Sequence, residues 1–223
     1  MRGPRLQICV AAALTVAASS GCGQSSLRDL PLWRVEIDPS GKEVRLVSLP
    51  FEQVSYDMKT NQVVRRVEDR NQDGVSDRIT VYEGLGGARL EETDTDFDGH
   101  VDRWDTFGAE GQRLRSASAS VGMKADRMAT YDVAGRIRQI QIDSDHDGTF
   151  ETARVFEKGS LVEIRIDGDA NGRVDRVQDY RHGFMDAEEF DTNEDGRPDL
   201  RMTYGRDGAL IRVTVLSAGN SKR

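Results

Sequence analysis

The sequence has few of the residues on which disulfide bonds, catalysis and large cores usually depend. It contains 2 cysteines, 3 histidines and 5 prolines in 223 residues, and 37% of its residues are hydrophobic. Cys9 and Cys22 both lie near the start, so the rest of the chain has no thiol for a disulfide, a zinc site or a nucleophile. The histidines stand apart, and the patterns G-x-S-x-G and H-E-x-x-H and a phosphate-binding glycine loop are missing. We therefore expect a thin fold that is not an enzyme.

Basic residues are outnumbered by acidic ones. The chain has 31 Lys and Arg against 39 Asp and Glu, which gives a formal net charge of −8. We therefore expect no nucleic-acid partner, because such a surface repels a polyanion. Arginines such as Arg65, Arg66, Arg78, Arg103 and Arg127 recur at solvent-facing or cross-strand positions. We predict that they balance neighbouring acidic side chains.

The start of the chain has the three zones of an export signal. Two arginines precede an apolar run over 6–18, and small residues lead to Cys22. The run is too short to form a stable membrane span. Segment 19–22, with the sequence SSGC, resembles the bacterial lipobox, which precedes a cysteine that is acylated and becomes the new N-terminus. It departs from that motif at Ser19, where leucine is usual, and the alternative is a plain secretory signal with an incidental cysteine.

The lipobox resemblance implies a location and an anchor. Residues 1–21 would be a signal peptide, Cys22 would carry the lipid, and 22–31 would be a flexible tether. Gly23, in place of an aspartate after the cysteine, implies onward sorting to the outer membrane. We therefore expect a lipid-anchored lipoprotein of the cell envelope, either periplasmic or surface-exposed.

A nine-residue acidic pattern, D-x-[DN]-x-[DN]-G-x-x-[DE], is repeated along the chain. It occurs five times, starting at Asp69, Asp94, Asp143, Asp167 and Asp191. The starts step by 25, 49, 24 and 24 residues. The double-length step predicts a sixth unit that begins near Ser118 and has lost its ligands. Its ligand positions read Ser118, Ser120 and Gly122, and only Asp126 survives.

The residues between the acidic loops are periodic too. An aromatic stands five positions after the last acidic position of every unit, at Tyr82, Phe107, Tyr131, Phe156, Tyr180 and Tyr204. A glycine follows each aromatic within five residues and predicts a reverse turn. Alternation in the second half of each unit, as at Ile140 and Ile142, is typical of a strand. A related half-unit lies at Tyr56, and Trp33 to Leu49, broken at 38–41, predicts a similar hairpin.

These units predict an all-β fold, an antiparallel β-hairpin repeat array. Stacked hairpins form a meander with glycine turns along one edge and acidic loops along the other. We predict a curved, open, nearly single-layer sheet. A closed barrel or a propeller is the alternative, because the strands outnumber what an open sheet usually holds without curling. N-terminal hairpins would occupy 32–68, repeats of 24–25 residues 69–216, and a disordered tail 217–223.

The acidic loops have the ligand order of a calcium loop. Oxygen-bearing side chains stand at positions 1, 3, 5 and 9, with glycine at position 6 for a sharp turn. Such hard ligands suit calcium better than zinc or copper. The predicted ligands are Asp69, Asn71, Asp73 and Asp77; Asp94, Asp96, Asp98 and Asp102; Asp143, Asp145, Asp147 and Glu151; Asp167, Asp169, Asn171 and Asp175; and Asp191, Asn193, Asp195 and Asp199. We expect binding and folding to be coupled, because clustered carboxylates repel one another. The alternative is that Asp, Asn and Gly only form Asx turns between strands.

The loops resemble those of the EF-hand, the thrombospondin type-3 repeat and the calcium hairpins of integrin-type FG-GAP propellers. They match at positions 1, 3, 5, 6 and 9. They depart at position 12, where an EF-hand has a bidentate glutamate and this chain has Thr80, Asp105, Arg154, Gln178 and Met202. The resemblance therefore implies weak sites, on the order of 10⁻⁴ to 10⁻³ M.

Together these features favour a calcium-stabilised, monomeric lipoprotein that acts as a structural or interaction module. Its protein or glycan partner is unknown, and the membrane is contacted through the lipid. The alternative is a secreted enzyme or enzyme inhibitor that uses carboxylates outside the loops, such as Glu188 and Glu189. Two carboxylates that converge in a cleft away from the loops would favour this alternative.

Overall fold

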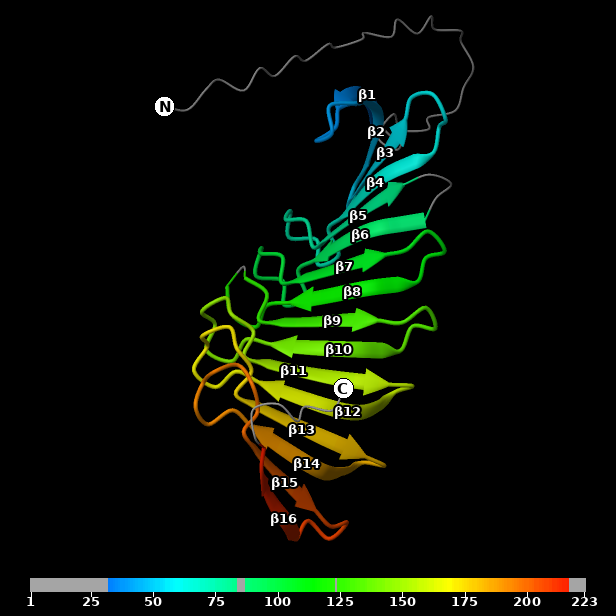
Figure 1. Cartoon of the computed structure of the whole chain (residues 1–223). Helices are drawn as coiled ribbons and strands as arrows, with labels where there is room; N and C mark the ends of the chain where they lie inside the picture. Colours follow the sequence, from blue (N-terminus) through cyan, green and yellow to red (C-terminus); the bar gives the residue numbers. More distant parts are fainter. Residues whose placement is uncertain (1–31, 84–86, 123, 217–223) are drawn as a thin grey trace, which may run out of the picture. The chain divides into compact units, whose positions relative to one another are not determined.

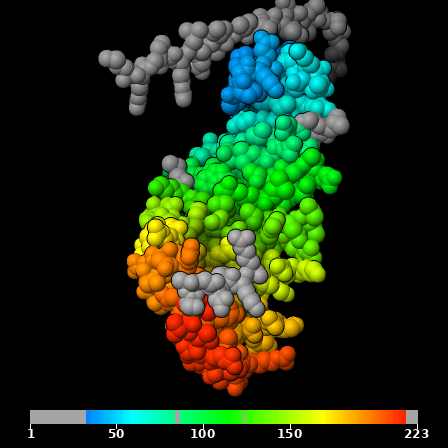
Figure 2. Space-filling model, viewed as in Figure 1, coloured from blue at the N-terminus to red at the C-terminus, as the bar shows by residue number. Residues whose placement is uncertain are grey.

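The chain forms one open β-sheet (Figure 1). The computed structural model describes residues 32–83, 87–122 and 124–216. These residues form 16 strands whose order in the sheet is their order in the sequence, and each strand is antiparallel to its neighbours. The prediction of an open antiparallel meander is confirmed, and the barrel and propeller alternatives are wrong. Figure 2 shows the successive segments as successive bands of colour.

The strands are short and similar in length. They are β1 (Leu32–Ile37), β2 (Glu43–Leu49), β3 (Glu52–Asp57), β4 (Val63–Glu68), β5 (Arg78–Glu83), β6 (Gly87–Thr93), β7 (Arg103–Phe107), β8 (Arg113–Ser118), β9 (Arg127–Tyr131), β10 (Ile137–Ile142), β11 (Thr152–Glu157), β12 (Ser160–Ile166), β13 (Arg176–Arg181), β14 (Phe184–Phe190), β15 (Leu200–Tyr204) and β16 (Leu210–Val215). The hairpin predicted over Trp33 to Leu49 is present as β1 and β2.

Several predictions concern parts of the chain that lie outside the described residues. These are the signal peptide over 1–21, the tether over 22–31, the lipid attachment site Cys22 and the tail over 217–223. In the described ranges, no helix has the length and hydropathy of a membrane span.

Two kinds of glycine-containing hairpin turn occur among the described residues. Lys158-Gly159 and His182-Gly183 join their strands as two-residue turns in which both φ angles are positive, at 50° and 87° and at 53° and 83°. Two positive φ angles define a type I′ turn, which matches the twist of the flanking strands. Longer turns are closed as in 132–136, where Asp132 N–H donates to the Arg136 carbonyl over 2.8 Å. The predicted glycine turns are therefore confirmed at these hairpins.

The strand register places the repeated aromatics on one face of the sheet. Ser118 pairs with both Arg103 on β7 and Arg127 on β9. Paired residues point to the same side and alternate residues share a face, so Phe107 and Tyr131 lie on the side of Ser118. The same relation holds in the other units, and we call this side the aromatic face.

The sheet has a thin core, as the composition predicts. Its buried hydrophobic residues are Val44, Leu46, Val54, Ala117, Ala129, Ile140 and Ala187, and they are divided between the two faces. Arginines cover aromatic rings, with the Arg45 guanidinium 4.6 Å from the Tyr56 ring centroid. Contacts between strands join only sequence neighbours. Stability therefore comes from a chain of neighbouring strand pairs rather than from a central core.

Candidate metal centres

All the acidic loops lie at the same end of the strands, along one side of the sheet. Each joins an even-numbered strand to the next odd-numbered strand, so antiparallel order brings them to the same side, at the left in Figure 1. Neighbouring loops are joined by backbone hydrogen bonds. The first-position N–H donates to the last-position carbonyl of the preceding loop, as from Asp94 to Asp77 and from Asp191 to Asp175, each over 2.8 Å.

This ladder corrects the predicted start of the sixth loop. Ser118 is the last residue of β8 and pairs with Arg127, so it is not a loop residue. Ala119 N–H donates to the Asp102 carbonyl over 2.8 Å, which makes Ala119 the first position. The loop spans 119–126, eight residues rather than nine, and Asp126 is its last position. We call it the acid-poor loop.

The other five loops share left-handed backbone at their fourth and sixth positions. The fourth residues, none of them glycine, have φ between 57° and 66°, and the sixth-position glycines have φ between 85° and 102°. A left-handed residue with a side chain costs about 1–2 kcal/mol. The first aspartate supports the turn, since one oxygen of Asp94 accepts from Gly99 N–H and one of Asp143 accepts from Gly148 N–H, both over 2.8 Å. These first-position oxygens therefore form Asx turns, as the alternative predicts. A metal would have to be bound by the remaining carboxylate oxygens of each loop.

Carboxylates converge in four of the five loops. Each group offers oxygens that all lie within 4.8 Å of one another, a spacing that one cation can bridge. The groups are Asp69, Asp73 and Asp77; Asp94, Asp96 and Asp102; Asp143, Asp145, Asp147 and Glu151; and Asp167, Asp169 and Asp175. The predicted amide ligands Asn71 and Asn171 lie in two of these loops and donate hydrogen bonds to Asp73 and Asp169.

Loop 143–151 has the strongest case for a cation. One oxygen of Asp143 accepts from Gly148, and one oxygen of Glu151 accepts from Ser144 N–H over 2.8 Å. The second oxygens, Asp143 Oδ1 and Glu151 Oε1, are buried and have no hydrogen-bond donor in the described residues. Asp143 is only 3% exposed. A buried carboxylate oxygen without a donor costs about 1–3 kcal/mol, so the donor set fits a metal that these oxygens would share.

Loop 69–77 also has a buried carboxylate oxygen without a hydrogen-bond donor, at one position. Asp77 is 2% exposed, and its Oδ2 accepts from the backbone N–H groups of Arg70 and Asn71. Its Oδ1 is buried without a donor among the described residues. This loop therefore offers one unsatisfied oxygen beside the carboxylates of Asp69 and Asp73.

Loop 94–102 shows the electrostatic cost of grouping acids. Burial and the negative charges of Asp98 and Asp102 raise the pKa of Asp96. Burial also acts to raise the pKa of Asp94, but backbone hydrogen bonds, led by that from Gly99, outweigh it and lower the value. The predicted ligand Asp98 lies outside the group, and its Oδ1 accepts from His100 N–H over 2.8 Å.

Loop 191–199 matches the sequence pattern but does not gather its acids. The Thr192 hydroxyl lies 2.9 and 2.8 Å from the two oxygens of Asp199 and shares its one hydrogen between them. Asp191 accepts from Gly196 and Asp195 N–H, and Asp195 accepts from Arg197 N–H. Within this fully described loop, Asp191, Asp195 and Asp199 form no group of the kind seen in the other four. A threonine hydroxyl at the same position, Thr95, donates to Asp102 in loop 94–102, which does gather its acids, so the hydroxyl by itself does not account for the difference.

The carboxylates suggested for an enzyme do not converge. Glu188 pairs with Gln178 and Glu189 pairs with Val177, so the two side chains leave opposite faces of β14. Burial acts to raise the pKa of Glu188, but hydrogen bonds from Tyr204, Arg176 and Gln178 outweigh it and lower the value. Glu189 is held by Arg201. This pair therefore offers no joint acid–base site.

No protein-family model matches the sequence, and a search of curated proteins finds no match.

Proposed function

We propose that the acidic loops bind calcium and that the chain is a lipid-anchored structural or interaction module of the cell envelope. The observation that carries the proposal is the pair of buried, donor-free oxygens, Asp143 Oδ1 and Glu151 Oε1, in a group of four carboxylates. A divalent cation would neutralise the group and supply the missing partner for both oxygens. Calcium suits the all-oxygen set, because it accepts flexible geometry and high coordination numbers, whereas magnesium demands a near-ideal octahedron.

The calcium proposal is tested by thermal unfolding and calorimetric titration of the Cys22→Ser chain. Calcium in the millimolar range is expected to raise the melting temperature, and the double variant Asp96→Ala, Asp145→Ala to reduce that rise, because each change removes a carboxylate from one group. Asp186→Asn, which removes one charge outside the loops, is the control. A melting temperature that is the same in excess chelator and in calcium would overturn the proposal.

The anchor proposal rests on the lipobox resemblance of segment 19–22 and is tested separately. Wild-type protein is expected in the membrane fraction, and Cys22→Ser is expected to move it to the soluble fraction, because the acylated residue is lost. Cell fractionation with immunodetection measures the distribution. Retention of the variant in the membrane would refute the anchor without affecting the calcium proposal.

A further inference from the structure

One arginine of a repeated row lacks the acidic partner that its equivalents have. The row is the first strand position after an acidic loop, and arginine occupies it at Arg78, Arg103, Arg127 and Arg176. Arg78 pairs with Glu91, Arg176 pairs with Glu188, and Arg103 Nε lies 2.9 Å from Asp105. In the part of the chain that the structure describes, Arg127 makes no ion pair. The prediction that these arginines balance neighbouring acids holds for Arg66, Arg78 and Arg103, whereas neither Arg65 nor Arg127 makes an ion pair among the described residues.

A serine stands at the position where an acidic partner of Arg127 is expected. Glu91 pairs with Thr80 and Asp105 across the sheet, and Glu188 holds the corresponding place between β13 and β15. Between β7 and β9 that place is taken by Ser116, which pairs with Asp105 and Ala129. A short hydroxyl side chain thus stands where two other units have a glutamate. It leaves both space and positive charge on the aromatic face.

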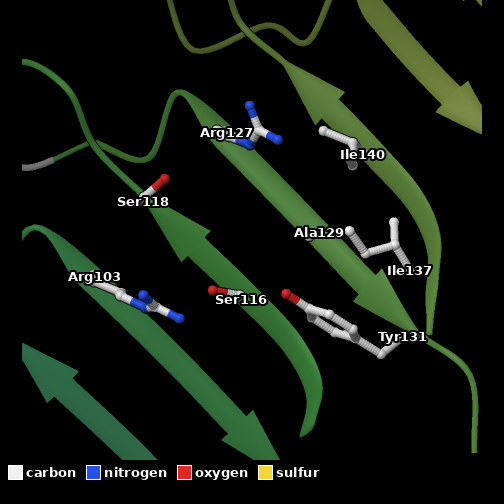
Figure 3. Close-up of a pocket in the computed structure, with 8 residues that line it drawn as sticks. All are labelled: Arg103, Ser116, Ser118, Arg127, Ala129, Tyr131, Ile137 and Ile140. Carbon is white, nitrogen blue, oxygen red and sulfur yellow. The ribbon is translucent and has the colours of Figure 1, made fainter. Parts of the chain in front are cut away.

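The space is a hollow of about 200 Å³ on the aromatic face (Figure 3). Its polar lining consists of Arg103, Arg127, Ser116, Ser118 and Tyr131, and Ala129, Ile137 and Ile140 complete it. Figure 3 shows Ser118 between the two arginines and the Tyr131 hydroxyl pointing toward Ser116. The lining therefore combines two guanidiniums, three hydroxyls and an apolar wall.

The local charge is positive although the whole chain is acidic. Asp105 is shared by two guanidiniums, with Arg103 Nε at 2.9 Å and Arg113 Nε at 3.2 Å. Arg113 also lies 5.9 Å from the Tyr131 ring centroid. Two guanidiniums thus share Asp105, the neighbouring Glu91 is held by Arg78, and the guanidinium of Arg127 is additional. The adjoining acid-poor loop adds only Asp126, whose carboxylate accepts from the Ser120 N–H and hydroxyl.

We propose that this hollow binds an oxyanion group, a carboxylate, phosphate or sulfate, carried by a small molecule or a glycan. Guanidinium forks match the geometry of such groups, and hydroxyls supply further donors. The bound oxygens take the place that Glu91 and Glu188 fill in the other units. The proposal is independent of calcium binding, because none of the lining residues belongs to a carboxylate group of the loops.

The test is calorimetric titration of the full chain with inorganic phosphate and, separately, with glucuronate, at fixed ionic strength and without added calcium. Saturable binding of at least one of them is expected, and which one binds distinguishes phosphoryl from carboxylate ligands. Arg127→Gln is expected to weaken binding about tenfold or more, because it removes a guanidinium that makes no ion pair within the described residues and would bond to the charged group. Absence of saturable binding to either anion would overturn the proposal.

Two further variants distinguish a specific binding site from nonspecific electrostatic attraction. Arg115→Gln removes the same charge from the opposite face of β8, where Arg115 pairs with Thr106 and Thr130, and is expected to leave binding unchanged. Ser116→Glu restores the glutamate of the other units and is expected to abolish binding and raise the melting temperature. Equal weakening by Arg115→Gln and Arg127→Gln would contradict a specific site.

Discussion

Loop 143–151 and the acid-poor loop are neighbours with the same place in the fold and different side chains. Asp143 N–H donates to the Asp126 carbonyl over 2.8 Å, so both take part in one backbone ladder. The first loop gathers four carboxylates, whereas the second retains only Asp126. The ladder therefore forms without acids at the first, third and fifth positions. The backbone ladder between the loops therefore does not explain why five of the six loops have acidic or amide residues at these positions.

The two loops also differ in how their last acidic residue is satisfied. Asp126 accepts two hydrogen bonds from Ser120, which outweigh the effect of burial and lower its pKa. Glu151 has a buried oxygen without a donor. Asp126 is hydrogen-bonded by Ser120 and also lies 3.5 Å from His146 Nδ1 of the neighbouring loop, whereas the free oxygen of Glu151 has no donor among the described residues and a cation would supply its partner. The same position is thus hydrogen-bonded within one loop and keeps a buried oxygen without a donor in the other.

The largest effect is expected from Asp126→Ala. It removes the acceptor of the Ser120 N–H and hydroxyl, and hydrogen bonds to a charged acceptor are worth about 2 kcal/mol. Urea unfolding measures the loss, which is expected to be equal in calcium and in chelator. A loss that appears only in calcium would mean that the acid-poor loop is itself a metal site.

A smaller and conditional effect is expected from Glu151→Gln. In chelator the variant is expected to be as stable as wild type or more stable, because one of four repelling charges is gone. At a calcium concentration ten times the dissociation constant, loss of the site removes about 1.4 kcal/mol of stabilisation. Urea unfolding in chelator and in calcium measures whether the effect of the substitution on the free energy of unfolding changes sign. Equal destabilisation with and without calcium would make Glu151 a structural residue like Asp126.

The sequence was sufficient to predict the sheet, its turns and the edge that carries the loops, because these depend on local periodicity. Three features needed the structure. The start of the acid-poor loop depends on a one-residue shortening that only hydrogen bonding between strands reveals. The failure of loop 191–199 to gather its acids is not visible in the ligand pattern, which this loop matches at every position. The lack of an ion pair at Arg127 within the described ranges depends on its cross-strand neighbours, although aligning Ser116 with Glu91 and Glu188 would have indicated it.

The restriction of contacts to consecutive strands has a consequence for the spacing of the loops. In a closed barrel the circumference fixes the number of strands. Here no such closure exists among the described strands, so a hairpin could be added or lost without changing distant pairings. Each added hairpin moves the next loop by two strand spacings, about 10 Å. The repeat therefore places its acidic loops at a regular spacing, and duplication of the gene segment for one hairpin would add one loop at the same spacing.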